Sequence, residues 1–71
     1  MEMIEFDSDH GRVLFITAIN GMIGKNVSVN GTEMEILFAD HHGVTGCSLT
    51  DENNPMVSVY FTDEPMVVRY L

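Results

Sequence analysis

Residues 12–23 read RVLFITAINGMI, an apolar run that is interrupted only by the dipeptide Asn20-Gly21 and by Thr17. Asn-Gly suits a two-residue hairpin turn best, because both residues readily adopt positive φ angles. The pattern therefore predicts two antiparallel strands, 12–19 and 22–29, joined at this turn. Both faces of the first strand would be apolar, so we expect it to be covered on both sides or to present one face to a partner.

Short apolar runs separated by Gly, Pro, Asn and Asp continue on both sides of this hairpin, which is typical of an antiparallel sheet. We expect about six short strands in hairpins. Their predicted ranges are 3–7, 12–19, 22–29, 44–50, 56–62 and 66–71. A chain of 71 residues cannot support two cores, so residues 1–71 are expected to form a single domain.

Segment 30–43 allows two interpretations. Asn30-Gly31 could close a second hairpin and lead into a strand, which accounts better for Ile36. Alternatively, residues 32–35 have the form of a helix capping box and Gly43 would stop the helix. Such a helix would gather one buried stripe: Met34, Leu37, Phe38 and His41. We favour the helix, which predicts an α+β fold, mostly antiparallel β, with one short helix near 33–42. The alternative is an all-β small barrel or sandwich.

Composition excludes several classes of function. Eleven acidic residues against three basic ones give a formal net charge of −8, which repels nucleic-acid phosphates and favours basic protein partners. No apolar run is long enough to span a membrane, and the acidic N-terminal segment does not resemble a secretory signal. Cys47 is the only cysteine, so an internal disulfide is excluded and a cytoplasmic location is expected.

Asp40-His41-His42 resembles, over three residues, the motif that names the DHH phosphoesterases. Those enzymes have two domains and further acidic motifs, and nothing else in this chain corresponds to them. Neighbouring side chains also diverge on a helix or a strand, so His41 and His42 cannot easily bind one ion together. A transition-metal site that joins His10, His41 or His42 to acids would have to be assembled by the fold, since their spacing does not favour it.

Two other patterns lack the partners that their chemistry needs. Asp7, Asp9 and Gly11 match the start of a calcium loop, but Ala18 stands where the bidentate Glu would be required. Cys47 would need a stabilised thiolate to act as a nucleophile, and its acidic, nearly Lys- and Arg-free setting disfavours one. We therefore expect no catalytic residue, no cofactor and no metal, and we expect that the protein is not an enzyme.

The apolar supply is generous for so short a chain, with six Met, four Phe and two Tyr. The leading hypothesis is a small non-enzymatic protein-interaction module that forms a homo-oligomer or binds another, basic protein. One alternative is an acidic nucleic-acid mimic that inhibits a nucleic-acid-binding protein, and another is a small ligand- or metal-binding β-domain. The expected interface lies on the 12–19 strand or the terminal strand. Its residues are Val13, Phe15, Ile19, Met22, Met66, Val68 and Tyr70.

Overall fold

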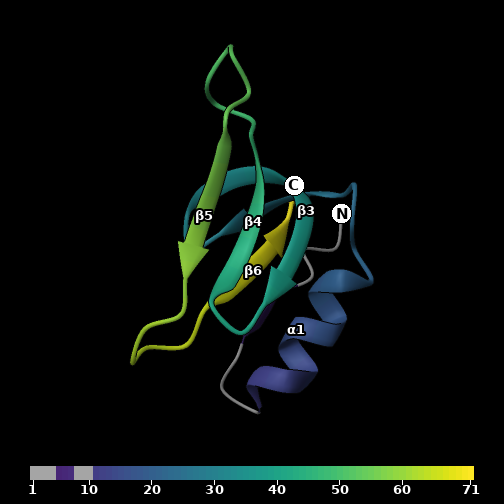
Figure 1. Ribbon diagram of the computed structural model, residues 1–71, viewed down its shortest axis with the longest axis vertical. Helices are drawn as coiled ribbons and strands as arrows, with labels where there is room; N and C mark the ends of the chain where they lie inside the picture. The colour runs from purple at the N-terminus through teal and green to yellow at the C-terminus, as the bar shows by residue number, and fades with distance from the viewer. Residues whose placement is uncertain (1–4, 8–10) are drawn as a thin grey trace.

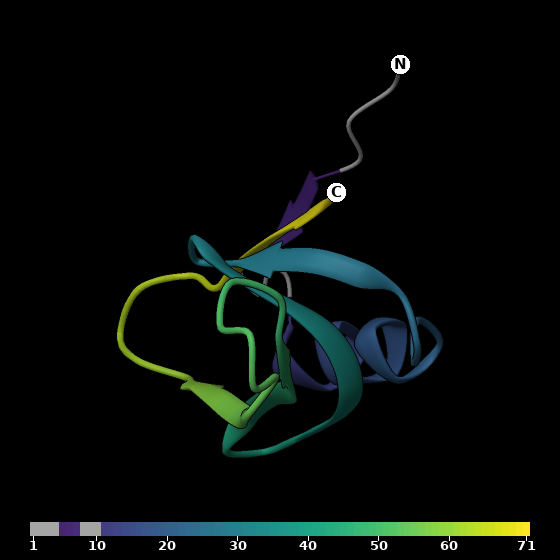
Figure 2. The same cartoon turned by 90° about the horizontal axis from the view of Figure 1, so that it is seen from above.

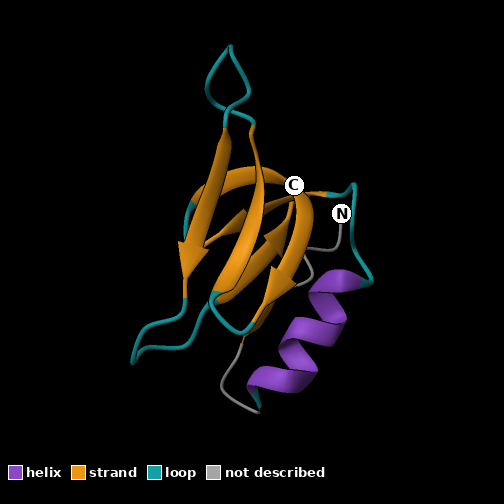
Figure 3. Cartoon of the chain, viewed as in Figure 1, coloured by secondary structure: helices purple, strands orange, loops and turns teal. Residues whose placement is uncertain are grey.

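A single curved sheet with one helix at its side forms the structure, a computed structural model that describes residues 5–7 and 11–71 (Figures 1 and 3). The elements are β1 (Glu5–Asp7), α1 (Arg12–Asn20), β2 (Asn26–Val29), β3 (Thr32–Asp40), β4 (Gly43–Ser48), β5 (Met56–Tyr60) and β6 (Val67–Tyr70). All strand pairs are antiparallel, in the order β1-β6-β2-β3-β4-β5. The α+β class is confirmed. The all-β alternative is wrong, since the sheet is single, unclosed and accompanied by a helix.

The helix was predicted in the wrong place, because α1 occupies residues 12–20, where a strand was expected. Phe15 and Ile19, four residues apart, share the buried side of α1, while Val13 and Leu14 are more than two-thirds exposed. An isolated segment of this composition suits either structure. The curved sheet leaves one side of its core uncovered, and a helix with an i, i+4 apolar pair covers it.

The two Asn-Gly dipeptides have different roles. Gly21 ends α1, with its N–H donating to the carbonyls of Thr17 and Ala18 and with a φ of −77° that any residue can adopt. The predicted hairpin at Asn20-Gly21 is therefore wrong. Asn30-Gly31 instead forms the two-residue turn between β2 and β3, with φ angles of 49° and 89°. Both positive values match the turn type that Asn-Gly favours, and Gly31 has no Cβ to oppose its angle.

The predicted helix at 33–42 is also wrong, because residues 32–40 form β3. The physical reason is a β-bulge between Ile36 and Phe38, which inserts one extra residue, Leu37, into the strand. The bulge reverses the alternation, so the buried residues are Met34, Ile36 and Ala39. Because the bulge breaks the two-residue period of a strand, the sequence pattern favoured a helix here. Ile36 is fully buried, although the helix predicted that it would be more exposed.

The core lies between α1 and the inner face of the sheet, and α1 runs beside β3 (Figure 2). We call the opposite side of the sheet its outer face. Strand β1 covers part of the predicted strand 3–7, and residues 3, 4 and 8–10 lie outside the described part of the chain. The core consists of apolar side chains from nearly every described element: Phe15, Ile19, Met22, Val27, Val29, Met34, Ile36, Ala39, Val44, Met66 and Val68.

The edge of β3 that extends beyond β2 is closed by α1 and the segment after it. Ile36 exchanges backbone hydrogen bonds with Gly24 and Lys25. Further along, the Asn20 side chain donates to the Ala39 carbonyl at 3.0 Å and accepts from the Ala39 N–H at 2.8 Å. One side-chain amide thus replaces one residue of a neighbouring strand, and this fixes the end of α1 against β3.

Candidate protein-interaction surface

Strand β5 forms one edge of the sheet, and no described strand pairs with its outer side. Hydrogen bonds link Phe61 N–H to the His42 carbonyl and Ser48 N–H to the Pro55 carbonyl, each at 2.9 Å. Alternate residues bond across an antiparallel pair, so these contacts and the register fix which groups point outward. The backbone N–H and C=O groups of residues 56, 58 and 60 point away from β4. We call this row of groups the β5 edge.

The β5 edge lacks the protection that natural edge strands usually carry. Its sequence, MVSVY, contains no charged residue and no proline, whereas exposed edges are commonly blocked by lysine, proline or a bulge. Met56 is 67% exposed and Tyr60 is 65% exposed. Uncharged backbone donors and acceptors beside exposed apolar side chains are the features that allow another strand to pair.

The outer face of β3, β4 and β5 carries a small cluster of aromatic and polar side chains. The registers place Asp40, Gly43 and Tyr60 in one row across the three strands. The next row contains Phe38, Thr45 and Ser58, with the Thr45 and Ser58 hydroxyls 2.8 Å apart. Gly43 adds no side chain between Asp40 and Tyr60, and a Cβ there would collide with the backbone of Val59 and Tyr60.

A shallow groove of about 340 Å³ lies over these two rows. Its lining residues are Phe38, Asp40, His42, Gly43, Thr45 and Tyr60. We call it the Phe38–Tyr60 groove. Asp40 supplies its carboxylate, and one oxygen of that carboxylate accepts hydrogen bonds from the backbone N–H groups of His42 at 2.8 Å and Gly43 at 3.3 Å. These bonds, chiefly that from His42, lower the pKa of Asp40 below its ordinary value of 3.8, and the carboxylate is ionised at neutral pH.

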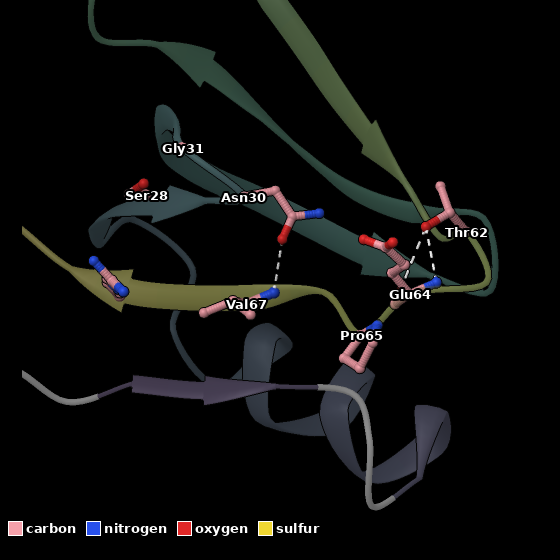
Figure 4. Close-up of a pocket in the computed structure, with 8 residues that line it drawn as sticks. Ser28, Asn30, Gly31, Thr62, Glu64, Pro65 and Val67 are labelled. Atoms are coloured by element: carbon pink, nitrogen blue, oxygen red, sulfur yellow. Dashed lines mark hydrogen bonds between the residues drawn. The ribbon is translucent and has the colours of Figure 1, made fainter.

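A larger polar hollow of about 620 Å³ lies between β2, β6 and the loop before β6 (Figure 4). Asn30 lines this hollow and ties the β2–β3 turn to β6, because its side-chain oxygen accepts a hydrogen bond from Val67 N–H at 2.8 Å and its own N–H donates to the Val67 carbonyl. Thr62 and Glu64 close the rim through hydrogen bonds to each other. The polar groups of Asn30 and Thr62 thus maintain the fold here.

Most of the predicted interface residues lie inside the chain. Phe15, Ile19, Met22, Met66 and Val68 are buried in the core, so a partner cannot contact them. Val13 is 74% exposed on the outer side of α1, and Tyr70 is half-buried against the core. They were expected on the 12–19 strand or on the terminal strand, but 12–19 lies in a helix and Val68 and Tyr70 of β6 pack toward the core. Self-association itself stays a prediction.

The histidine and cysteine motifs are not brought together into a reactive site. Within residues 5–7 and 11–71, no three His, Cys, Asp or Glu side chains are placed to hold a metal ion. His41 and His42 stack at 4.1 Å between ring centroids in the exposed β3–β4 turn. Cys47 lies opposite Glu35 and Met56, so neither neighbour across the sheet is a histidine. Asp9 and His10 lie outside the described residues.

Four acidic side chains flank β5 at its two ends, and Glu33, Glu35 and Asp40 are in β3. Asp51 and Glu52 are in the turn that precedes β5, while Asp63 and Glu64 follow β5 at the opposite end (Figure 1). The alternative of a nucleic-acid mimic, which requires its carboxylates on one surface, stays a prediction. The described residues include no helix that is long and apolar enough to cross a membrane.

Sequence reasoning missed Phe38, Met56, Ser58 and Tyr60 as surface residues. A signal was present, because MVSVY is an uncharged run in a chain of charge −8. Its position at the sheet edge could not be predicted from the sequence.

In comparisons with known proteins, the chain matches no family model, no curated protein and no solved structure.

Proposed function

We propose that this protein is a non-enzymatic protein-interaction module that forms a homo-oligomer through its β5 edge. The observation that carries the proposal is the β5 edge itself, five residues long, uncharged and flanked by exposed Met56 and Tyr60. Strand addition supplies backbone hydrogen bonds without requiring a deep pocket, which suits a chain of this size. A lone thiol and the acidic composition fit a reducing, cytoplasmic setting.

The β5 edge is complementary to itself. Two antiparallel copies can pair about a two-fold axis at Ser58, because residues 56, 58 and 60 all point their backbone groups outward. In that register Met56 lies opposite the partner's Tyr60, and Tyr60 lies opposite the partner's Met56. Sulfur–aromatic contacts and removal of both side chains from water would stabilise the pair.

Charge repulsion opposes this association. Each copy has a formal charge of −8, and antiparallel pairing brings the acids before one β5 toward the acids after the other. These acids are on exposed loops, where salt screens their repulsion over a distance of about 10 Å at 0.1 M. Added salt should therefore tighten the oligomer.

The test compares Ser58→Pro with Ser58→Ala by light scattering behind a sizing column, at micromolar concentration and in low and high salt. Both variants lose the hydroxyl that pairs with Thr45, so they differ in the outward N–H and in the proline ring that fixes φ. Proline at this position removes no bond to β4. We expect the native chain and Ser58→Ala to form dimers and Ser58→Pro to be a monomer.

Circular dichroism should show that Ser58→Pro keeps its fold. A native chain that elutes only as a 7.9 kDa monomer in both salts would refute self-association. An unchanged dimer of folded Ser58→Pro would show that association uses another surface.

A further inference from the structure

The Phe38–Tyr60 groove has the dimensions of a site for one side chain. Phe38 is on β3 and Tyr60 is on β5, so β4 separates them. Neighbouring strands are about 4.8 Å apart, and Phe38 also lies two residues along the sheet from the row of Tyr60, so the two aromatic positions are roughly 12 Å from each other. Allowing for the thickness of the rings, the space above Gly43 admits one flat or compact group. Gly43 adds no side chain to the groove, and a Cβ there would collide with the backbone of Val59 and Tyr60 rather than extend over the sheet.

The lining chemistry selects a cation. Aromatic faces attract ammonium and guanidinium groups that lie within about 6 Å of the ring centroid, and a group midway between the two rings meets that limit on both sides. Asp40, which lies in the same row as Tyr60, adds a negative charge to the lining of the groove. Only one of its oxygens accepts hydrogen bonds from residues that the structure describes, so the other can accept a bond from a ligand.

The lysine and the two arginines of the chain do not line the groove, and the histidine that does, His42, has its Nδ1 3.6 Å from the Asp40 oxygen that already accepts the backbone bonds. Arg12 lies over the ring of Phe61, 4.4 Å from its centroid, and Arg69 is in β6. Lys25 precedes β2 and bonds to β3 through its backbone. A net charge of −8 adds long-range attraction for a basic partner.

We propose that the Phe38–Tyr60 groove binds the side chain of an arginine or lysine from a basic polypeptide. Tyr60 and Phe38 enclose the cationic head, and the Asp40 carboxylate pairs with it. Pairing of β5 would cover the side of Tyr60 that faces the partner's Met56, while the side that faces Phe38 and Gly43 would stay open to a cation from the outer face. The inference therefore goes beyond self-association and does not depend on it.

The experiment titrates the isotope-labelled protein with a capped pentapeptide that carries arginine at its second and fourth positions between threonines. The control peptide has citrulline, the neutral isostere of arginine, at both positions. Amide chemical shifts are followed at physiological salt, which suppresses unspecific attraction. We expect the arginine peptide to shift the resonances of Phe38, Asp40, Gly43 and Tyr60, and the citrulline peptide to leave them unchanged.

Three variants test the roles of the lining groups. Asp40→Asn keeps the acceptor for His42 and Gly43 but removes the charge, and Tyr60→Leu removes one ring from an exposed position. Each should weaken peptide binding roughly two- to fivefold, as expected for one exposed cation–π or ion-pair contact. Tyr60→Phe keeps the ring and should bind like the native chain.

Ser58→Pro separates this inference from self-association, because it blocks the β5 edge and changes none of the six residues that line the groove, and Ser58→Ala controls for the lost hydroxyl partner of Thr45. Peptide binding by Ser58→Pro should equal that of the native chain. Equal shifts from the citrulline peptide would overturn the proposal. Arginine-dependent shifts centred on the Asp51 or Asp63 loops would overturn it too, because they would indicate general charge attraction.

Discussion

Asn20 offers the sharpest test of how this fold is held together. Its side chain makes two hydrogen bonds, of 3.0 and 2.8 Å, to the backbone of Ala39, a residue that is only 7% exposed. In Asn20→Ala both bonds disappear and the Ala39 N–H and C=O lose their partner. Each net hydrogen bond contributes about 0.5–1.5 kcal/mol, and unsatisfied buried groups cost more. Asn20 is itself exposed, so water can enter, and we expect a loss of about 1–2 kcal/mol.

Urea unfolding measures this loss. With a slope of about 1 kcal/mol per molar for a small domain, the midpoint should fall by roughly 1–2 M. Thr17→Ala on the same helix removes only an exposed side-chain bond to Val13 and should change stability by less than about 0.5 kcal/mol. Faster hydrogen exchange at the Ala39 amide should accompany the loss.

Asn20→Asp removes only the side-chain donor, so it tests the hydrogen bond to the Ala39 carbonyl separately from the bond that the Ala39 N–H donates. The introduced carboxylate can still accept from Ala39 N–H, but it sets a negative oxygen against the Ala39 carbonyl. Its pKa in the folded state should therefore be raised, so this variant should regain stability as pH falls and the carboxyl protonates. An Asn20→Ala midpoint equal to that of the native chain would refute the view that the amide replaces a strand residue.

Three further predictions concern other positions. Gly46→Ala should lower the free energy of unfolding, measured in urea, by about 1–3 kcal/mol, because a Cβ there would meet the Glu35 carbonyl oxygen and lie 2.8 Å from the Met34 sulfur. Gly21 has a φ that any residue can adopt, so Gly21→Ala should lower it by less than half as much. Asp40 should titrate below 3.8 when its carboxyl group is followed by NMR. Because its pKa is lower in the folded than in the unfolded state, ionised Asp40 stabilises the fold at pH values above the unfolded-state pKa, and this contribution is lost as the pH falls through the folded-state pKa. Asp40→Asn should remove that pH dependence. Chelator and added zinc should leave the thermal midpoint unchanged, and a zinc-dependent rise that is lost in His41→Ala with His42→Ala would contradict this.

The sequence by itself determined the class of the fold and most strand positions. Runs of apolar residues between turn-forming residues marked β4, β5 and β6, because alternation and turn chemistry are local properties. The Asn30-Gly31 hairpin was also readable as one of two alternatives. The exclusion of an internal disulfide, which follows from the single cysteine, needed no structure either.

Only the tertiary structure decided where the helix lies. Residues 12–20 are apolar enough for either a strand or a helix, and the exposed flank of β3 selects the helix because Asn20 and Phe15 can then close the edge and the core together. The bulge at Leu37 hid β3, since one extra residue breaks the two-residue period on which strand prediction depends. The β5 edge and the Phe38–Tyr60 groove could not be predicted from the sequence for a related reason. Which strand becomes an edge, and which side chains line up across three strands, depends on the pairing of distant segments, and no local pattern encodes that pairing.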